Sequence, residues 1–186
     1  EGRLYAFGAK KIAKPVAHTK PHAPASGAAR EVAALKEAAK ITEGYALVLG
    51  LSDGAVAEAL ANDFTVIAID PDAGKVDALR RRLHARGLYG SRVSALVGDP
   101  LTFSLPPFLA SLVVTEMSSR LKANDSADAL PKIFHTLRPY GGTACLPVPK
   151  AARGNWKKSA AEFKSAKTGE ADEWLLLSRT GPLHQA

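Results

Sequence analysis

The stretch that decides the fold is YALVLGLSDGAVAEALANDFTVIAID, residues 45–70. Its apolar runs predict one buried strand over residues 45–49 and a second that ends on Asp70, with a tight turn between Gly50 and Gly54 that leads into a short helix. This order of strand, glycine turn, helix and strand is the first half of a nucleotide-binding βαβ unit. The stretch therefore predicts a small-molecule site at the carboxyl end of the first strand.

The size and composition of the chain are those of one globular domain. It has 186 residues, of which 46% are hydrophobic and 23% charged, enough for a sizeable core. No apolar run approaches the roughly 20 residues that cross a bilayer, so no membrane segment is predicted. The single cysteine, Cys145, excludes an internal disulfide or a cysteine-cluster metal site, and the five histidines show no ligand spacing. No metal site is predicted.

The chain carries a formal charge of +7. Much of the excess lies in the first third, at Lys10, Lys11, Lys14, Lys20, Arg30, Lys36 and Lys40. A basic balance is typical of proteins that bind nucleic acid. Only 6% of the residues are aromatic, however, so side chains on which bases could stack are scarce. Nucleic acid is therefore a partner that the composition allows but does not favour, and a solvated basic arm is the simpler interpretation.

The beginning of the chain differs from the rest. Residues 1–8, EGRLYAFG, alternate like an edge strand and resemble the closing strand of a repeat in the pyrroloquinoline-quinone type of β-propeller. The resemblance implies a covalently linked propeller domain, and the absence of an initial Met predicts a piece of a longer protein. Residues 9–29, rich in Lys, Pro, Ala and Gly, predict a linker. The domain itself is expected over residues 30–180, with a tail over residues 181–186.

Strands and helices continue to alternate beyond the central unit. The pattern predicts helices over residues 29–41, 71–87, 126–137 and 154–167, strands over residues 92–97, 109–115, 143–148 and 173–178, and irregular chain over residues 101–107. Such alternation indicates an α/β fold with a doubly wound, mostly parallel sheet.

The turn between Gly50 and Gly54 suits a ligand that lies over it. Side chains at these two positions would collide with such a ligand, and free amides at the start of the following helix favour electron-rich groups. Asp53, inside the turn, would repel a pyrophosphate and would suit an amino group or a sulfonium. The simpler alternative is that Asp53 only caps the helix that begins at Gly54.

Two further carboxylates end successive strands. Asp70 is placed to accept hydrogen bonds from both hydroxyls of a ribose, as in dinucleotide folds, or to cap the next helix beside Pro71. Asp99 is placed to meet an adenine amino group, or is an ordinary turn aspartate before Pro100. With Gly50 upstream, the ribose role is favoured for Asp70, whereas both interpretations of Asp99 stay open.

These residues resemble the successive motifs of class I S-adenosylmethionine-dependent methyltransferases. The motifs are LVLGLSDG at residues 47–54, Asp70, Gly98-Asp99 and LRPYGG at residues 137–142, and their order and spacing match over residues 30–150. The resemblance implies a Rossmann-like fold, S-adenosylmethionine as cofactor, and cofactor contacts from Gly50, Leu51, Ser52, Asp53, Gly54, Asp70, Pro71, Asp99 and Pro100. Glu116, just past the fourth strand, would face the transferable methyl group as the candidate catalytic residue, with His135 as a more remote base.

Three departures from the family pattern limit what the resemblance implies. Ser52 stands where the family usually has its middle glycine, so we expect a tighter loop. Residues 115–118, TEMS, replace the Asn/Asp-Pro-Pro-Tyr/Phe signature, so methylation of an adenine or glutamine nitrogen is not expected. The region after the fifth strand supplies one further strand, which predicts a sheet truncated at its C-terminal hairpin.

The sequence thus supports a methyltransferase domain with an unknown acceptor as the first hypothesis. The alternative is a catalytically eroded module that binds S-adenosylmethionine, or mediates an interaction, within a larger propeller protein. A nicotinamide-dependent oxidoreductase is disfavoured by Asp53 and by residues 138–142. Because S-adenosylmethionine is made and kept inside cells, the cytoplasm is favoured if the cofactor is bound, but quinoprotein propellers are often exported and the compartment stays undecided.

Overall fold

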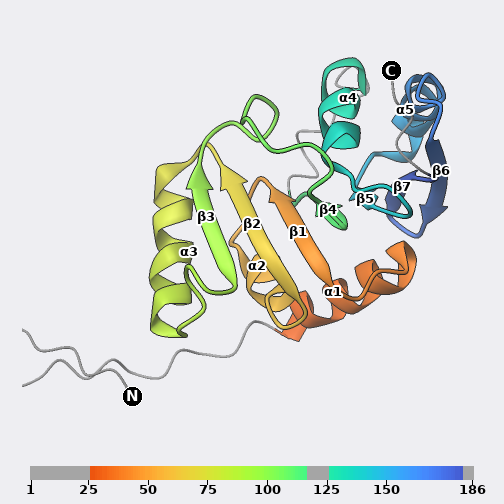
Figure 1. Cartoon of the computed structure of the whole chain (residues 1–186). Coiled ribbons are helices and arrows are strands. Elements are labelled where there is room, and N and C mark those ends of the chain that lie inside the picture. Colours follow the sequence, from red (N-terminus) through yellow and green to blue (C-terminus); the bar gives the residue numbers. More distant parts are fainter. Residues whose placement is uncertain (1–25, 117–125, 182–186) are drawn as a thin grey trace, which may run out of the picture.

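The structure of the chain is a computed structural model that describes residues 26–116 and 126–181. These residues form a sheet of seven strands between two layers of helices (Figure 1). The predicted edge strand over residues 1–8, most of the predicted linker and the predicted tail beyond Gly181 lie outside the described residues. The link to a propeller domain therefore stays a prediction.

The described elements follow the predicted alternation of strands and helices. In chain order they are α1 (Ser26–Ala39), β1 (Gly44–Leu49), α2 (Ala55–Leu60), β2 (Phe64–Asp70), α3 (Ala73–Ala85), β3 (Val93–Val97), β4 (Leu112–Val114), α4 (Ser126–Thr136), β5 (Thr143–Leu146), η2 (Lys150–Ala152, a 3-10 turn), α5 (Arg153–Ala160), β6 (Ala166–Ala171) and β7 (Trp174–Arg179). The strands lie in the order β3-β2-β1-β4-β5-β7-β6, with β1 to β5 parallel and β7 antiparallel to both neighbours. The predicted doubly wound, mostly parallel sheet is confirmed.

The predicted truncation at the C-terminal hairpin is wrong, because β6 and β7 form that hairpin. Strand β7 pairs antiparallel with β5, where Cys145 faces Leu176, and β6 pairs with β7 as the outermost strand. The helix predicted over residues 154–167 ends at Ala160. Strand β6 has the sequence AKTGEA, which carries no apolar alternation, and none of its residues is fully buried. As the outermost strand it pairs on one side only. Its identity as a strand comes from backbone pairing with β7.

Helix α1 begins at Ser26, so the predicted linker is too long by residues 26–29. Ala28 is buried together with Val32 and Leu35, which extends the apolar side of the helix one turn earlier than the sequence pattern indicates. In the structure this side of α1 packs against the sheet and against α2.

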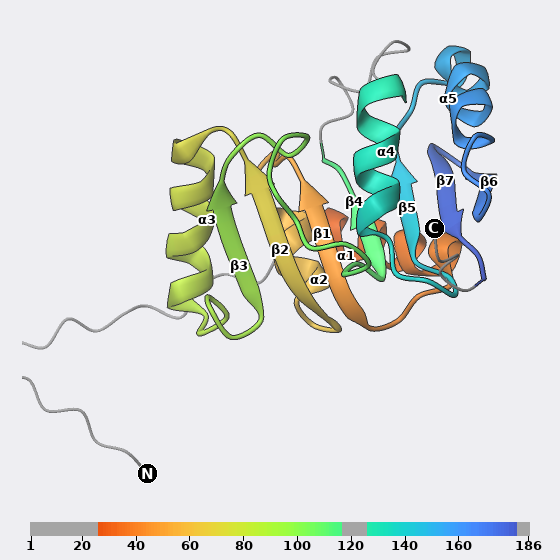
Figure 2. The same cartoon turned by 45° about the horizontal axis from the view of Figure 1, so that its top comes forward.

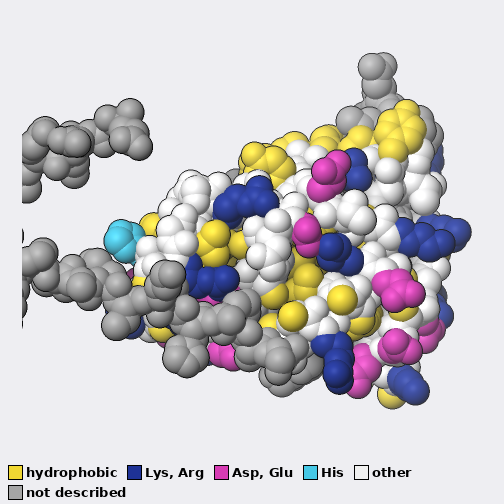
Figure 3. All heavy atoms as spheres, turned by 90° about the horizontal axis from the view of Figure 1, so that it is seen from below, with side chains coloured by type: hydrophobic (Ala, Val, Ile, Leu, Met, Phe, Trp, Pro, Cys, Tyr) yellow, Lys and Arg dark blue, Asp and Glu magenta, His cyan; other side chains and the backbone are white. Residues whose placement is uncertain are grey.

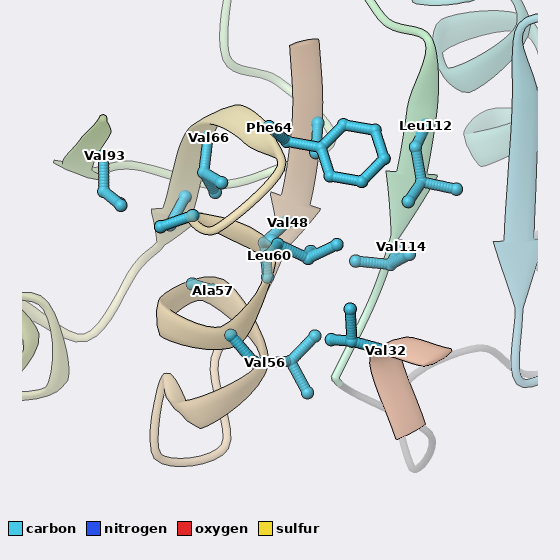
Figure 4. Packing of buried hydrophobic residues seen from close by; sticks show 14 of the residues in the cluster. Val32, Val48, Val56, Ala57, Leu60, Phe64, Val66, Val93, Leu112 and Val114 are labelled. Carbon is cyan, nitrogen blue, oxygen red and sulfur yellow. The ribbon is translucent and has the colours of Figure 1, made fainter. Parts of the chain in front are cut away.

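Each face of the sheet is covered by its own group of helices (Figure 2). Helices α1, α2 and α3 cover one face, where Val32, Leu60 and Phe64 pack against side chains of β1 and β4 such as Val48 and Val114 (Figure 4). Helices α4 and α5 cover the other face and bury Trp156 completely. Because side chains on both faces of the sheet are buried, the sequences of β1 and β4 are continuous apolar runs.

The strand order reverses between β1 and β4. From β1 the chain crosses to β2 and β3 on one side, whereas β4 and β5 lie on the other. The loops that follow β1 and β4 therefore leave the sheet in different directions, and a crevice opens at the carboxyl ends of these two strands. This is the place that the glycine turn and Glu116 occupy.

Charges on the face seen in Figure 3 are mixed. Seen from below Figure 1, Lys and Arg side chains alternate with Asp and Glu, and no extended patch of one sign gathers on the described part of this face (Figure 3). Among the described helices, none is long and apolar enough to cross a bilayer.

Candidate functional site

Two glycines shape the loop between β1 and α2. Gly50 and Gly54 have φ angles of 80° and 81°, a backbone conformation in which a side chain is strained. A Cβ atom at Gly54 would also lie 2.9 Å from Cδ1 of Leu79 on α3. Gly54 is thus required for close packing of the loop against α3 as well as for the turn itself, a reason that the sequence pattern did not reveal.

Asp70 connects this loop to the next one. Its carboxylate is buried, with 2% of the residue exposed. Oδ2 accepts a hydrogen bond from the amide of Leu51 at 2.6 Å, and Oδ1 accepts one from the amide of Asp72 at 2.7 Å. Asp72 in turn caps α3 by accepting from the amides of Gly74 and Lys75. In this structure Asp70 therefore uses both oxygens to position the loops after β1 and β2.

Glu116 spans the crevice from the end of β4. Its Oε2 accepts hydrogen bonds from the amide and the hydroxyl of Ser52, at 2.7 and 2.6 Å, and from the more distant amide of Gly54 at 3.4 Å. Its Oε1 is buried and has no hydrogen-bond partner among the described residues. The carboxylate thus joins the two loops that flank the crevice, and the Ser52 hydroxyl gives a structural reason for serine where the family usually has glycine.

Two basic side chains of α3 donate hydrogen bonds to main-chain carbonyl oxygens of the loop between β1 and α2. Lys75 donates from Nζ to the carbonyl oxygen of Leu51 at 2.7 Å, and Arg82 donates to that of Asp53. Arg82 also pairs with the buried carboxylate of Glu58 at 2.6 Å. The Arg82 side chain is still 43% exposed, so it lies on the surface while it makes these two contacts. The spacing of seven residues between Lys75 and Arg82, which places both on one side of a helix, is the signal that could have identified them.

The two remaining aspartates make local turns. Oδ1 of Asp53 accepts from the amide of Ala55 at 2.9 Å, so the predicted cap exists, although the N-cap residue of α2 is Gly54. Asp99 is exposed, and its Oδ1 accepts from the amide of Leu101 at 2.8 Å. This bond is the turn interaction that was one of the two interpretations of Asp99, and the exposed carboxylate still has capacity for a ligand.

A cavity of about 440 Å³ lies beside Glu116. It is lined by Gly27, Arg30, Glu31, Ala34, Thr115, Glu116, Pro147, Glu173 and Trp174. Glu31 is only partly buried; this partial burial, and then the neighbouring carboxylates of Glu116, Glu173 and Asp53, raises its pKa above the usual value. The walls of this cavity are therefore rich in negative charge.

A second cavity, also of about 440 Å³, lies on the face covered by α4. Its walls come from Leu49, residues 100–105 and the last turns of α4, including Lys132 and His135. The structure thus brings Pro100 and His135 together in this cavity, and neither of them is among the described residues that line the cavity beside Glu116. This separation argues against His135 as a base that acts with Glu116.

The sheet is doubly wound, and a glycine turn and carboxylates lie where its strand order reverses, between β1 and β4. These features are typical of α/β proteins that bind a small molecule at the carboxyl ends of the strands. The chain belongs to the methyltransferase domain family, whose model matches residues 46–141, more than half of its length. The matched residues include the glycine turn, Asp70, Asp99 and Glu116. The sequence has no match among curated proteins.

Solved structures of methyltransferases share the fold. A candidate S-adenosylmethionine-dependent methyltransferase of Methanococcus maripaludis is 17% identical, with a TM-score of 0.69 over 83% of this chain and 86% of that one. A methyltransferase of Geobacter sulfurreducens is 22% identical, with a TM-score of 0.62 over 82% and 79%. A geranyl diphosphate methyltransferase solved with S-adenosylmethionine is 12% identical, with a TM-score of 0.62 over 81% and 83%. These similarities agree with the predicted Rossmann-like fold.

Proposed function

We propose that this methyltransferase domain, whose cofactor is S-adenosylmethionine, transfers a methyl group at the crevice between the loops that follow β1 and β4. The observation that carries the proposal is Glu116, which bonds to the glycine loop through Oε2 and holds Oε1 buried without a partner among the described residues. A buried acceptor without a donor is costly, so a group that brings a donor or a positive charge is favoured next to it.

The charges of the crevice suit this cofactor better than a dinucleotide. S-adenosylmethionine supplies an electrophilic methyl group on a positively charged sulfonium and also carries an ammonium group, and the loop places the carboxylates of Asp53 and Glu116 nearby. A pyrophosphate needs free amides at the start of the helix. Here the amides of Leu51, Ser52 and Gly54 already bond to carboxylates. A nicotinamide dinucleotide is therefore disfavoured.

The cofactor-binding residues are assigned from their positions at the carboxyl edge. Residues 50–54, with Leu51 and Ser52 at their centre, would hold the methionine half. Asp99 and Pro100 at the end of β3 would face the adenine. Asp70, whose oxygens both bond to main-chain amides, would act with Pro71 by positioning the loops around the ribose.

Glu116 is assigned the catalytic role. Its Oε1, which has no hydrogen-bond partner within the described part of the chain, would take a proton from the acceptor, while Oε2 keeps the side chain attached to Ser52. The alternative, a module that binds the cofactor without turnover, is favoured by the same Oε2 contacts, because a carboxylate used to join two loops has a structural reason of its own.

Calorimetry of the chain with S-adenosylmethionine and with its demethylated product tests the assignment. We expect both to bind, and absence of binding near 1 mM, a free energy of only about 4 kcal/mol, would overturn it. Transfer of a labelled methyl group to an acceptor pool then distinguishes an active methyltransferase from a module that binds the cofactor without turnover. Label transfer excludes the eroded module, whereas binding without any transfer supports it.

A further inference from the structure

The cavity beside Glu116 is lined by carboxylates on one part of its wall and by apolar side chains on another. Helix α1 supplies Glu31, the loop after β4 supplies Glu116, and the turn before β7 supplies Glu173, so three carboxylates come from three separate parts of the chain. Pro147 and Trp174 supply an apolar side. A volume of about 440 Å³ lies within the range of small-molecule sites.

The negative charge of this cavity is poorly balanced. Arg30, which is exposed, is the one basic residue among its described lining residues. Neither Glu31 nor Glu173 forms an ion pair with another described residue. Partial burial, and then repulsion from Glu116 and Glu173, raises the pKa of Glu31 above its usual value. A bound cation would relieve this repulsion.

A second observation points to the same chemistry. Oε1 of Glu116, a lining residue, is buried and has no donor among the described residues. A protonated amine carries three donors and a positive charge, and so binds a carboxylate oxygen more strongly than an alcohol with its single neutral donor, whereas an ionised carboxylate has no donor to offer. Trp174 can in addition place its ring against a cation or against an aromatic group.

We propose that this cavity binds the methyl acceptor as a small amine, with its ammonium group among Glu31, Glu116 and Glu173 and its apolar part against Pro147 and Trp174. Oε1 of Glu116 would take one proton from the ammonium, which frees the nitrogen lone pair. The neutral amine would then form a bond to the methyl carbon as the carbon–sulfur bond of the sulfonium breaks, and that electron pair would stay on the sulfur of the demethylated product. The inference rests on the proposed function, because it names the acceptor class of the same site. Glu31 and Glu173 are not among the residues assigned to the cofactor, which belong to the loops after β1, β2 and β3.

Three phenols of similar size test the charge preference by calorimetry with the whole chain. Tyramine carries an amine, tyrosol an alcohol and 4-hydroxyphenylacetate a carboxylate. We expect tyramine to bind at least about tenfold more tightly than tyrosol, a difference of about 1.4 kcal/mol, and 4-hydroxyphenylacetate not to bind. Equal binding of tyramine and tyrosol, preference for the carboxylate, or no binding of tyramine near 1 mM overturns the inference.

Matched variants locate the site. Glu173→Gln and Glu31→Gln should each weaken tyramine binding several-fold and leave the affinity for S-adenosylmethionine unchanged, whereas Glu43→Gln, an exposed glutamate outside the cavity, should change neither. Tyramine binding that survives both cavity variants overturns the inference. If S-adenosylmethionine binds and tyramine does not, the acceptor class alone is wrong. If tyramine binds with the expected preference and the cofactor does not, the amine site stands and the proposed function fails.

Discussion

Replacing Asp70 by alanine should destabilise the domain and weaken its cofactor site together. Asp70 is 2% exposed, and its two oxygens hold the amides of Leu51 and Asp72 at 2.6 and 2.7 Å. Asp70→Ala removes both acceptors and leaves the two amides in a site that water reaches poorly. The loops after β1 and β2 then lose their common anchor, so we expect lower stability and at least about tenfold weaker binding of S-adenosylmethionine, or about 1.4 kcal/mol.

The size of the stability effect follows from these contacts. A hydrogen bond to a charged group contributes about 1.5–3 kcal/mol, and water that enters beside the smaller side chain recovers part of the loss. The expected cost is therefore about 3–4 kcal/mol. For a domain of this size each kcal/mol lowers the melting temperature by about 2–4 °C, so the variant should melt about 6–16 °C below the wild type.

Urea unfolding followed by circular dichroism measures this cost, and calorimetry at low temperature measures the binding loss in the folded variant. Asp99→Ala is the matched control, because Asp99 also ends a strand but is exposed and makes one local bond, to the amide of Leu101. We expect the control to cost less than about 1 kcal/mol. An Asp70→Ala variant as stable as the Asp99→Ala control would refute the role of Asp70 as an anchor of the two loops.

Three further predictions concern other parts of the site. Ser52→Ala removes the 2.6 Å hydroxyl bond to Glu116 and should cost about 1 kcal/mol, and a double-mutant cycle with Glu116→Gln should show a coupling of at least about 0.5 kcal/mol, whereas additive effects would contradict the bond. Partial burial and neighbouring carboxylates raise the pKa of Glu31, so its protonated form is favoured in the folded state and stability is lost as the pH rises through the folded pKa. Glu31→Gln should therefore raise the unfolding free energy at neutral pH by less than about 1 kcal/mol, since the side chain is largely exposed and its charge is screened by solvent. This gain in unfolding free energy should vanish below pH 4.5, the usual pKa of the carboxyl group. A gain that does not change with pH contradicts the prediction. Burial raises the pKa of Cys145 to about 12, so a thiol reagent at mildly alkaline pH should label the unfolded chain and spare the native one, and rapid labelling of folded protein would count against the burial of β5.

Several features of this protein are local enough to be predicted from the sequence. The apolar run in residues 45–49 predicts a buried strand, and residues 46–49 of β1 are buried. Gly50 and Gly54 predict a turn with unusual backbone angles, and both have positive φ. Asp70 predicts a carboxylate at the end of β2. Each of these predictions depends on a few neighbouring residues, whose propensities and burial pattern decide the outcome.

Other features were decided by tertiary structure. Strand β6, AKTGEA, has no strand pattern of its own and exists because β7 supplies its hydrogen-bond partners. The bond between Ser52 and Glu116 joins residues 64 positions apart, and it forms only because the strand order places β4 beside β1. The acidic cavity depends in the same way on α1 and the turn before β7 meeting at the edge of the sheet.

The chain's identity as an α/β domain with a glycine turn followed by acidic strand ends was thus determined by its sequence alone. Which polar groups meet at the crevice, and which of them have no partner left among the described residues, was decided by packing. The physical reason is range: burial patterns and turn preferences act over a few residues, whereas hydrogen bonds and charges act between groups that only the complete sheet brings together. A cofactor cleft filled permanently by Glu116, with no binding of S-adenosylmethionine, would leave the fold intact and remove the function proposed for it.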